Sequence, residues 1–146
     1  MRTSLLTLAI AATLTLAGCS SLEETKYPLS GLQEYEVSDQ IAEELNAGGF
    51  DCTDYERGTG SLTAASSGTC WHPHADTEKD QEIIVMVFNT ESDQNSQAQL
   101  YRNMADLIDS GGFVTGGNWM VNCGNKPVCT SVAEVLGGRT ETASVF

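Results

Sequence analysis

Positively charged residues are scarce in this chain of 146 residues. Lysine and arginine number 7 against 20 aspartates and glutamates, so the formal net charge at pH 7 is −13. A surface of that sign repels phosphate groups, which disfavours binding to nucleic acid and electrostatic attraction to anionic lipid headgroups. The acidity fits a solvated outer surface or cationic partners.

The sequence also lacks an apolar run long enough to remain in a membrane. The uncharged stretch at residues 5–16 has 12 residues, whereas a membrane-spanning helix needs roughly 20. It follows the positively charged start Met1-Arg2 and leads into small residues, which is the order of a secretory signal. The stretch therefore predicts export of the chain and disfavours a transmembrane helix.

The residues that close this stretch are Leu16-Ala17-Gly18-Cys19, and two serines follow. They resemble the lipobox of bacterial lipoproteins, in which the cysteine thiol receives a diacylglyceryl group and becomes the first residue of the mature protein. A plain secretory signal would also end in small residues, but all four positions fit the lipid-modification pattern. The resemblance implies a signal peptide at residues 1–18 and lipidation of Cys19. Two or more acyl chains, palmitate among them, hold a protein stably at the membrane.

The rest of the chain predicts one small domain. In residues 19–37 the apolar residues do not recur at a sustained helical or strand spacing, and Pro28 and Gly31 interrupt the segment. This predicts a flexible tether with a reach of up to about 60 Å at 3.3–3.6 Å per residue. Residues 38–139 alternate between helical and extended patterns and form the predicted domain. Residues 140–146 are expected to be a C-terminal tail.

Hydrophobic spacing predicts three helices around a buried strand. Ser38 is the expected N-cap of the first helix, which stops at Gly48-Gly49, and two later helices are expected after Asn89 and from Pro127. Six consecutive apolar residues at 83–88 indicate a central strand covered on both faces. The order of elements favours a small two-layer α+β sandwich, with a mainly antiparallel sheet of three or four strands, helices on one face and two disulfides.

Four cysteines remain once Cys19 is assigned to lipid, namely Cys52, Cys70, Cys123 and Cys129. An even number in a small exported domain indicates two disulfides. Three pairings are possible, and proximity in sequence favours Cys52 with Cys70 and Cys123 with Cys129. In the chain-entropy model these loops of 19 and 7 residues would contribute about 3 and 2 kcal/mol. A redox pair of Cys123 and Cys129 is the alternative, but five residues separate them where thiol-redox motifs have two.

The only two histidines, His72 and His74, lie two residues apart beside Asp76. Alternate residues of an extended segment can point the same way, so these three side chains are weak candidates for a metal site. Such a site needs three or four converging ligands, and the chain has neither an HExxH nor a Cys-x-x-Cys pattern. Solvent-exposed histidines in an acidic loop are the simpler interpretation, and no cofactor is expected.

No catalytic motif stands out. The sequence has no Gly-x-Ser-x-Gly elbow and no glycine-rich phosphate loop of the GxGxxG or GxxxxGK[ST] order. An enzyme would need a cleft with a perturbed titratable group, and none can be named from the sequence. We therefore expect no enzyme activity.

The lipobox, the segments 49–52 and 68–70, and the segment 117–123 ahead of a helix that ends at Leu136 together resemble small secreted lipoproteins of high-GC Gram-positive bacteria. The similarity spans most of the mature chain, but the histidine pair does not map onto it. It implies an extracytoplasmic, lipid-anchored, cell-surface protein with two disulfides and supplies no activity. A binding module for a protein, peptide or cell-wall partner is the expected function, with a metal-binding lipoprotein as the alternative.

Overall fold

The computed structural model describes residues 26–58, 61–73, 79–105 and 111–142. It contains a single six-stranded sheet in the order β1-β2-β3-β5-β4-β6, in which all neighbouring strands are antiparallel. The elements along the chain are α1 (Ser38–Ala47), β1 (Thr53–Arg57), β2 (Ser66–His72), β3 (Gln81–Val87), α2 (Glu91–Ala105), β4 (Gly112–Thr115), β5 (Trp119–Asn122), α3 (Lys126–Leu136) and β6 (Arg139–Thr142). Among these helices, none has an apolar stretch that could cross a membrane.

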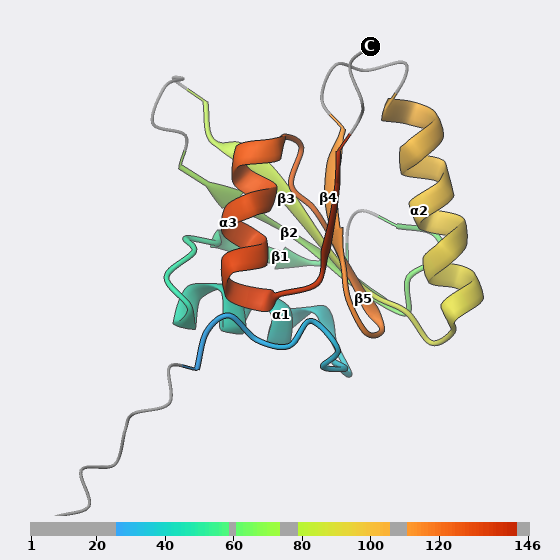
Figure 1. Ribbon diagram of the computed structural model, residues 1–146, viewed down its shortest axis with the longest axis horizontal. Coiled ribbons are helices and arrows are strands. Elements are labelled where there is room, and N and C mark those ends of the chain that lie inside the picture. Colours follow the sequence, from blue (N-terminus) through green and yellow to red (C-terminus); the bar gives the residue numbers. More distant parts are fainter. Residues whose placement is uncertain (1–25, 59–60, 74–78, 106–110, 143–146) are drawn as a thin grey trace, which may run out of the picture.

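The α+β class with two disulfides is confirmed, but two details of the expected sandwich are wrong. The sheet has six strands where three or four were expected. The helices also cover both faces of it, since α1 and α3 lie on one side and α2 on the other (Figure 1). The fold is therefore a three-layer arrangement with the sheet in the middle.

The segment that was expected to form a strand covered on both faces explains the second helical layer. Ile83, Val85 and Val87 point into a core shared with α1 and α3. Met86 and Phe88 point the other way, into a smaller core that includes Ala98 of α2. Because successive side chains of a strand point to opposite faces, a continuous apolar run needs a covering layer on each side.

The predicted tether at residues 19–37 is wrong for its described part, residues 26–37. This segment, which we call the strap, is packed on the domain: Leu29 N donates to Val135 O at 2.9 Å, and Gly117 N donates to Gly31 O at 2.9 Å. The side chains of Tyr27, Leu29 and Tyr35 contact the larger core. The irregular sequence reflects a strap without regular secondary structure, because its hydrogen bonds go to distant segments.

The predicted C-terminal tail is also wrong in its first residues. Residues 139–142 form β6, which pairs with β4 between Thr115 and Arg139 at one end and Gly112 and Thr142 at the other. The polar sequence of β6 gave no strand signal because an edge strand needs few buried side chains. Residues 143–146 lie outside the described residues, as do the predicted signal peptide and residues 19–25.

Trp119 is the largest fully buried side chain and lies beneath the strap. Tyr35 packs edge-on against its indole with ring centroids 6.3 Å apart. Gly116 lies so close to the indole that a β-carbon there would overlap the ring, and a β-carbon at Gly31 would overlap the backbone of Gly138. The missing side chains at Gly31 and Gly116 thus allow three backbone segments to meet over one tryptophan.

Asn118 joins the strap to the turn between β4 and β5. Its Oδ1 accepts from Tyr35 N at 2.9 Å, and its Nδ2 donates to Tyr35 O at 2.8 Å. One amide side chain thereby satisfies both polar groups of a backbone unit, as a neighbouring strand would do.

We expect Asn118→Ala to lower the free energy of unfolding by about 2 kcal/mol, because two partly buried hydrogen bonds are lost and their backbone partners are left unpaired. Urea denaturation followed by circular dichroism measures this change. Asn89→Ala is the matched control, since Asn89 is exposed and makes no side-chain hydrogen bond within the described residues. Equal stabilities of the two variants would contradict the role of Asn118.

Candidate functional site

Both predicted disulfides are present with the favoured pairing. Cys52 and Cys70 are bonded with their Cα atoms 5.3 Å apart, and Cys123 and Cys129 are bonded with their Cα atoms 5.2 Å apart. All four side chains are buried. The first bridge joins the start of β1 to β2, and the second joins the end of β5 to α3.

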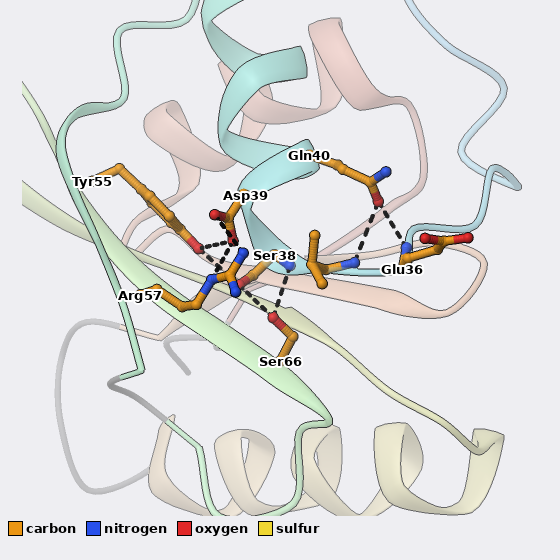
Figure 2. A network of polar contacts seen from close by, with 8 residues as sticks. Glu36, Ser38, Asp39, Gln40, Tyr55, Arg57 and Ser66 are labelled. Atoms are coloured by element: carbon orange, nitrogen blue, oxygen red, sulfur yellow. Dashed lines mark hydrogen bonds and ion pairs between the residues drawn. The ribbon is translucent and has the colours of Figure 1, made fainter.

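A polar network joins the start of α1 to the edge of the sheet (Figure 2). Ser38 is fully buried, and its hydroxyl oxygen lies 2.7 Å from Tyr55 OH and 2.8 Å from Ser66 Oγ. Tyr55 OH donates to Asp39 Oδ2 at 3.1 Å, and the Arg57 guanidinium donates to both carboxylate oxygens of Asp39 at 2.7 and 2.9 Å. Three hydroxyls and one ion pair therefore form a continuous chain.

The expectation that Ser38 caps α1 is wrong. The N-cap residue is Val37. The backbone N–H groups of Glu36 and Val37 donate to Oε1 of Gln40, at 2.8 and 3.3 Å. Ser38 turns inward instead, because the hydroxyls of Tyr55 and Ser66 are within reach. A tertiary contact thus replaces a local one.

Gly68 permits the position of Tyr55. This glycine lies in β2, next to β1, and a β-carbon there would overlap the Tyr55 ring. Without that side chain, the ring crosses the face of β2 and its hydroxyl reaches α1. The network therefore depends on a small residue that makes none of its hydrogen bonds.

The electrostatics of the network fit a structural role. The hydrogen bonds from Arg57 lower the pKa of Asp39, and burial raises the pKa of Tyr55. Neither group is then a good proton acceptor near neutral pH: Asp39 is weakly basic, and Tyr55 is protonated. The hydroxyl of Ser38 is also inaccessible to a substrate.

The Asp39–Arg57 pair predicts a loss of stability in acid. A pKa that is lower in the folded state than the unfolded value near 3.9 stabilises the fold above that value, and this contribution is lost as the pH falls through the folded pKa. We expect Arg57→Gln to raise the pKa of Asp39 towards its ordinary value. The cost in stability at pH 7 should be small, because the pair is exposed and solvent screens its attraction.

The measurement is an NMR titration of the Asp39 carboxyl together with urea denaturation between pH 2 and pH 7. Lys126→Gln is the matched control, since it removes one exposed positive charge that has no ion-pair partner within the described residues. An Asp39 pKa that stays the same in Arg57→Gln would refute this account. Glu141, whose pKa is lowered by hydrogen bonds from Arg102, should titrate as in the native protein.

His72 has a defined environment, whereas the other predicted metal ligands, His74 and Asp76, lie outside the described residues. The His72 ring stacks on Phe50 with centroids 4.1 Å apart, and its Nδ1 lies 2.9 Å from Asp51 O. The carbonyl can only accept, so Nδ1 donates and Nε2 is left as the one nitrogen for a metal. No group of three or more metal-ligating side chains occurs among the described residues. The metal site stays a prediction that calorimetric titration with zinc and copper would test, with His72→Ala as control.

The described residues enclose a groove of about 670 Å³. Its walls are part of the strap, the first turns of α2, the turn between β4 and β5, and the start of β6. These segments come together at one end of the sheet (Figure 1). The volume is within the range of small-ligand sites, which is roughly 300–1,000 Å³.

The charges of the groove are only partly neutralised. Arg102 and Arg139 both pair with Glu141, at 2.7 and 2.8 Å. Glu34 and Glu91 also line the groove, and neither carboxylate has a partner within the described residues. Among the described residues the groove therefore presents two carboxylates without an ion-pair partner, together with the exposed side chain of Leu32.

Sequence reasoning did not find this groove. Its polar side chains, such as Asn89 and Asn95, resemble any solvated surface, and the glycines at its base belong to turns. The signal that was available is the pair Gly116-Gly117, because two adjacent glycines in a turn permit close approach of another backbone. Comparisons of the chain with protein-family models, with curated proteins and with solved structures find no match.

Proposed function

We propose that the protein is a lipid-anchored extracytoplasmic binding module whose groove holds a ligand with a positively charged group. The lipobox at residues 16–19 and the two disulfides, which are typical of oxidising compartments, support the location. The observation that carries the binding role is the groove with two carboxylates, Glu34 and Glu91, that have no partner in the part of the chain the structure describes.

The ligand class follows from charge and shape. Both arginines of the groove are already paired with Glu141, so an anionic ligand would have to compete with that carboxylate. A primary amine or guanidinium would instead meet free carboxylates in a protein of net charge −13, whose field attracts cations. A lysine-bearing or arginine-bearing peptide, or an amine of the cell wall, fits these conditions.

The anchor is tested by mass spectrometry of the protein extracted from membranes without reduction. The expected mass is that of residues 19–146 with acyl groups on Cys19 and with four cysteines oxidised in pairs. Cys19→Ser should be released from the membrane fraction. An unmodified precursor with free thiols inside the cell would overturn the proposed location.

The groove is tested by NMR titration of the soluble Cys19→Ser protein with a tri-lysine peptide. We expect chemical-shift changes at the backbone amides of Leu32, Glu34 and Glu91. The dissociation constant should be about fivefold higher in Glu34→Gln/Glu91→Gln, since exposed ion pairs contribute up to about 1 kcal/mol. Glu56→Gln, on the opposite sheet edge, is the matched control. Shift changes spread evenly over all acidic residues would count against a specific groove.

A further inference from the structure

The strap shortens the distance between the domain and the lipid anchor. Lys26 is fixed on α1, because its ammonium pairs with Glu44 and the neighbouring Tyr27 hydroxyl donates to the same carboxylate. Only seven peptide steps separate Lys26 from Cys19, so the reach is at most about 25 Å at 3.3–3.6 Å per residue. A tether that includes the strap residues would have more than twice that reach.

The anchored end of the domain is also the end that carries the groove. Strap residues Ser30, Leu32 and Glu34 line the groove. The backbone N–H of Leu29 donates a hydrogen bond to Val135 O near the end of α3. Figure 1 shows the strap, the turn between β4 and β5 and the start of α2 at the same end of the sheet. Lys126 begins α3 at the opposite end, where the preceding residue, Asn125, donates from Nδ2 to Oε1 of Gln81, the first residue of β3.

We infer that the lipid on Cys19 holds the groove-bearing end towards the outer face of the membrane, so that the groove takes cationic groups presented at the bilayer surface. This inference rests on the proposed lipidation and adds to it an orientation and a place for the ligand. The length of chain beyond Lys26 and the position at which it leaves the domain carry the argument.

Charge keeps this end from lying flat on the bilayer. Glu34, Glu36, Glu43 and Glu91 are exposed at or near it, and anionic headgroups repel carboxylates within a Debye length of about 8–10 Å. The domain then stands off within the limit of its short tether, and the groove stays open to a ligand in the gap. Raising the salt concentration should bring the domain closer to an anionic bilayer.

The test uses the full lipid-modified protein in vesicles of phosphatidylcholine with phosphatidylglycerol, which carry an acceptor dye on a fraction of the headgroups. A donor dye is attached through Glu36→Cys at the anchored end or through Lys126→Cys at the far end. Both side chains are exposed, and the native disulfides are buried and oxidised. The seven residues of β3 separate the two ends by about 20 Å.

We expect energy transfer from position 36 to be about twofold higher than from position 126, given that separation and a dye pair of short Förster distance. A flexible Gly/Ser insertion between residues 25 and 26 should lower both values and reduce their difference. Equal transfer from a vesicle-bound protein, or higher transfer from position 126, would overturn the orientation alone. A protein that fails to float with the vesicles would overturn the anchoring itself.

Discussion

Replacing Trp119 by alanine is expected to lower the free energy of unfolding by about 3–5 kcal/mol. The indole is fully buried, and it fills the space where the strap and two turns converge. Its loss leaves a cavity that these segments cannot close, since they are already in backbone contact at Gly31 and Gly138. Urea denaturation at pH 7 measures the change, and a small domain loses much of its stability at this magnitude.

The chain provides its own control, because the second tryptophan, Trp71, is 39% exposed. Trp71→Ala should cost about 1 kcal/mol or less, as expected for a surface position. Similar costs at both positions would show that the convergence over Trp119 does not hold the fold together. Loss of Trp119 should also weaken tri-lysine binding, because Gly116 and Gly138 line the groove directly above it.

The elements that could be predicted from the sequence are those whose signal is local. The apolar run at residues 83–88 indicates a buried strand by composition alone, and Gly48-Gly49 marks the end of α1 because glycine stops a helix. The disulfide pairing followed from proximity in sequence. In each case the residues that determine the structure are near neighbours in the chain.

The missed elements depend on distant partners. The strap has no period of its own, and its fixed position comes from Asn118 and Val135, which are far away in sequence. The same reason applies to β6, whose backbone pairs with β4, a strand from which α3 separates it in the sequence. The second helical layer was missed although the run at 83–88 implied it, because α2 has few apolar residues and its covering role rests on Ala98 and Tyr101.

The candidate groove could not be predicted for a related reason. Its charges become informative only when the pairing is known: Glu141 is shared by both arginines, whereas Glu34 and Glu91 have no ion-pair partner within the described residues. From the sequence, all of these residues belong to the same acidic surface. The candidate site differs from the rest of the acidic surface in which of its carboxylates already form ion pairs.

The second large effect is expected from the disulfides, and its size should differ between them. Cys52→Ala/Cys70→Ala opens a loop of 19 residues, which in the chain-entropy model costs about 3 kcal/mol, and Cys123→Ala/Cys129→Ala opens a loop of 7 residues at about 2 kcal/mol. All four side chains are buried, so each double variant loses a similar amount of packing. The difference between the two unfolding free energies therefore isolates the contribution of loop length.

The location of each bridge predicts where the structure opens first. β1 is an edge strand whose side chains are mostly exposed, so the bridge from Cys52 to Cys70 holds a segment that hydrophobic burial holds weakly. Hydrogen exchange in the Cys52→Ala/Cys70→Ala variant should accelerate in β1 before it does in β3. A variant that exchanges uniformly, or a larger cost for the bridge between Cys123 and Cys129, would show that this disulfide acts on the whole fold and not through the edge of the sheet.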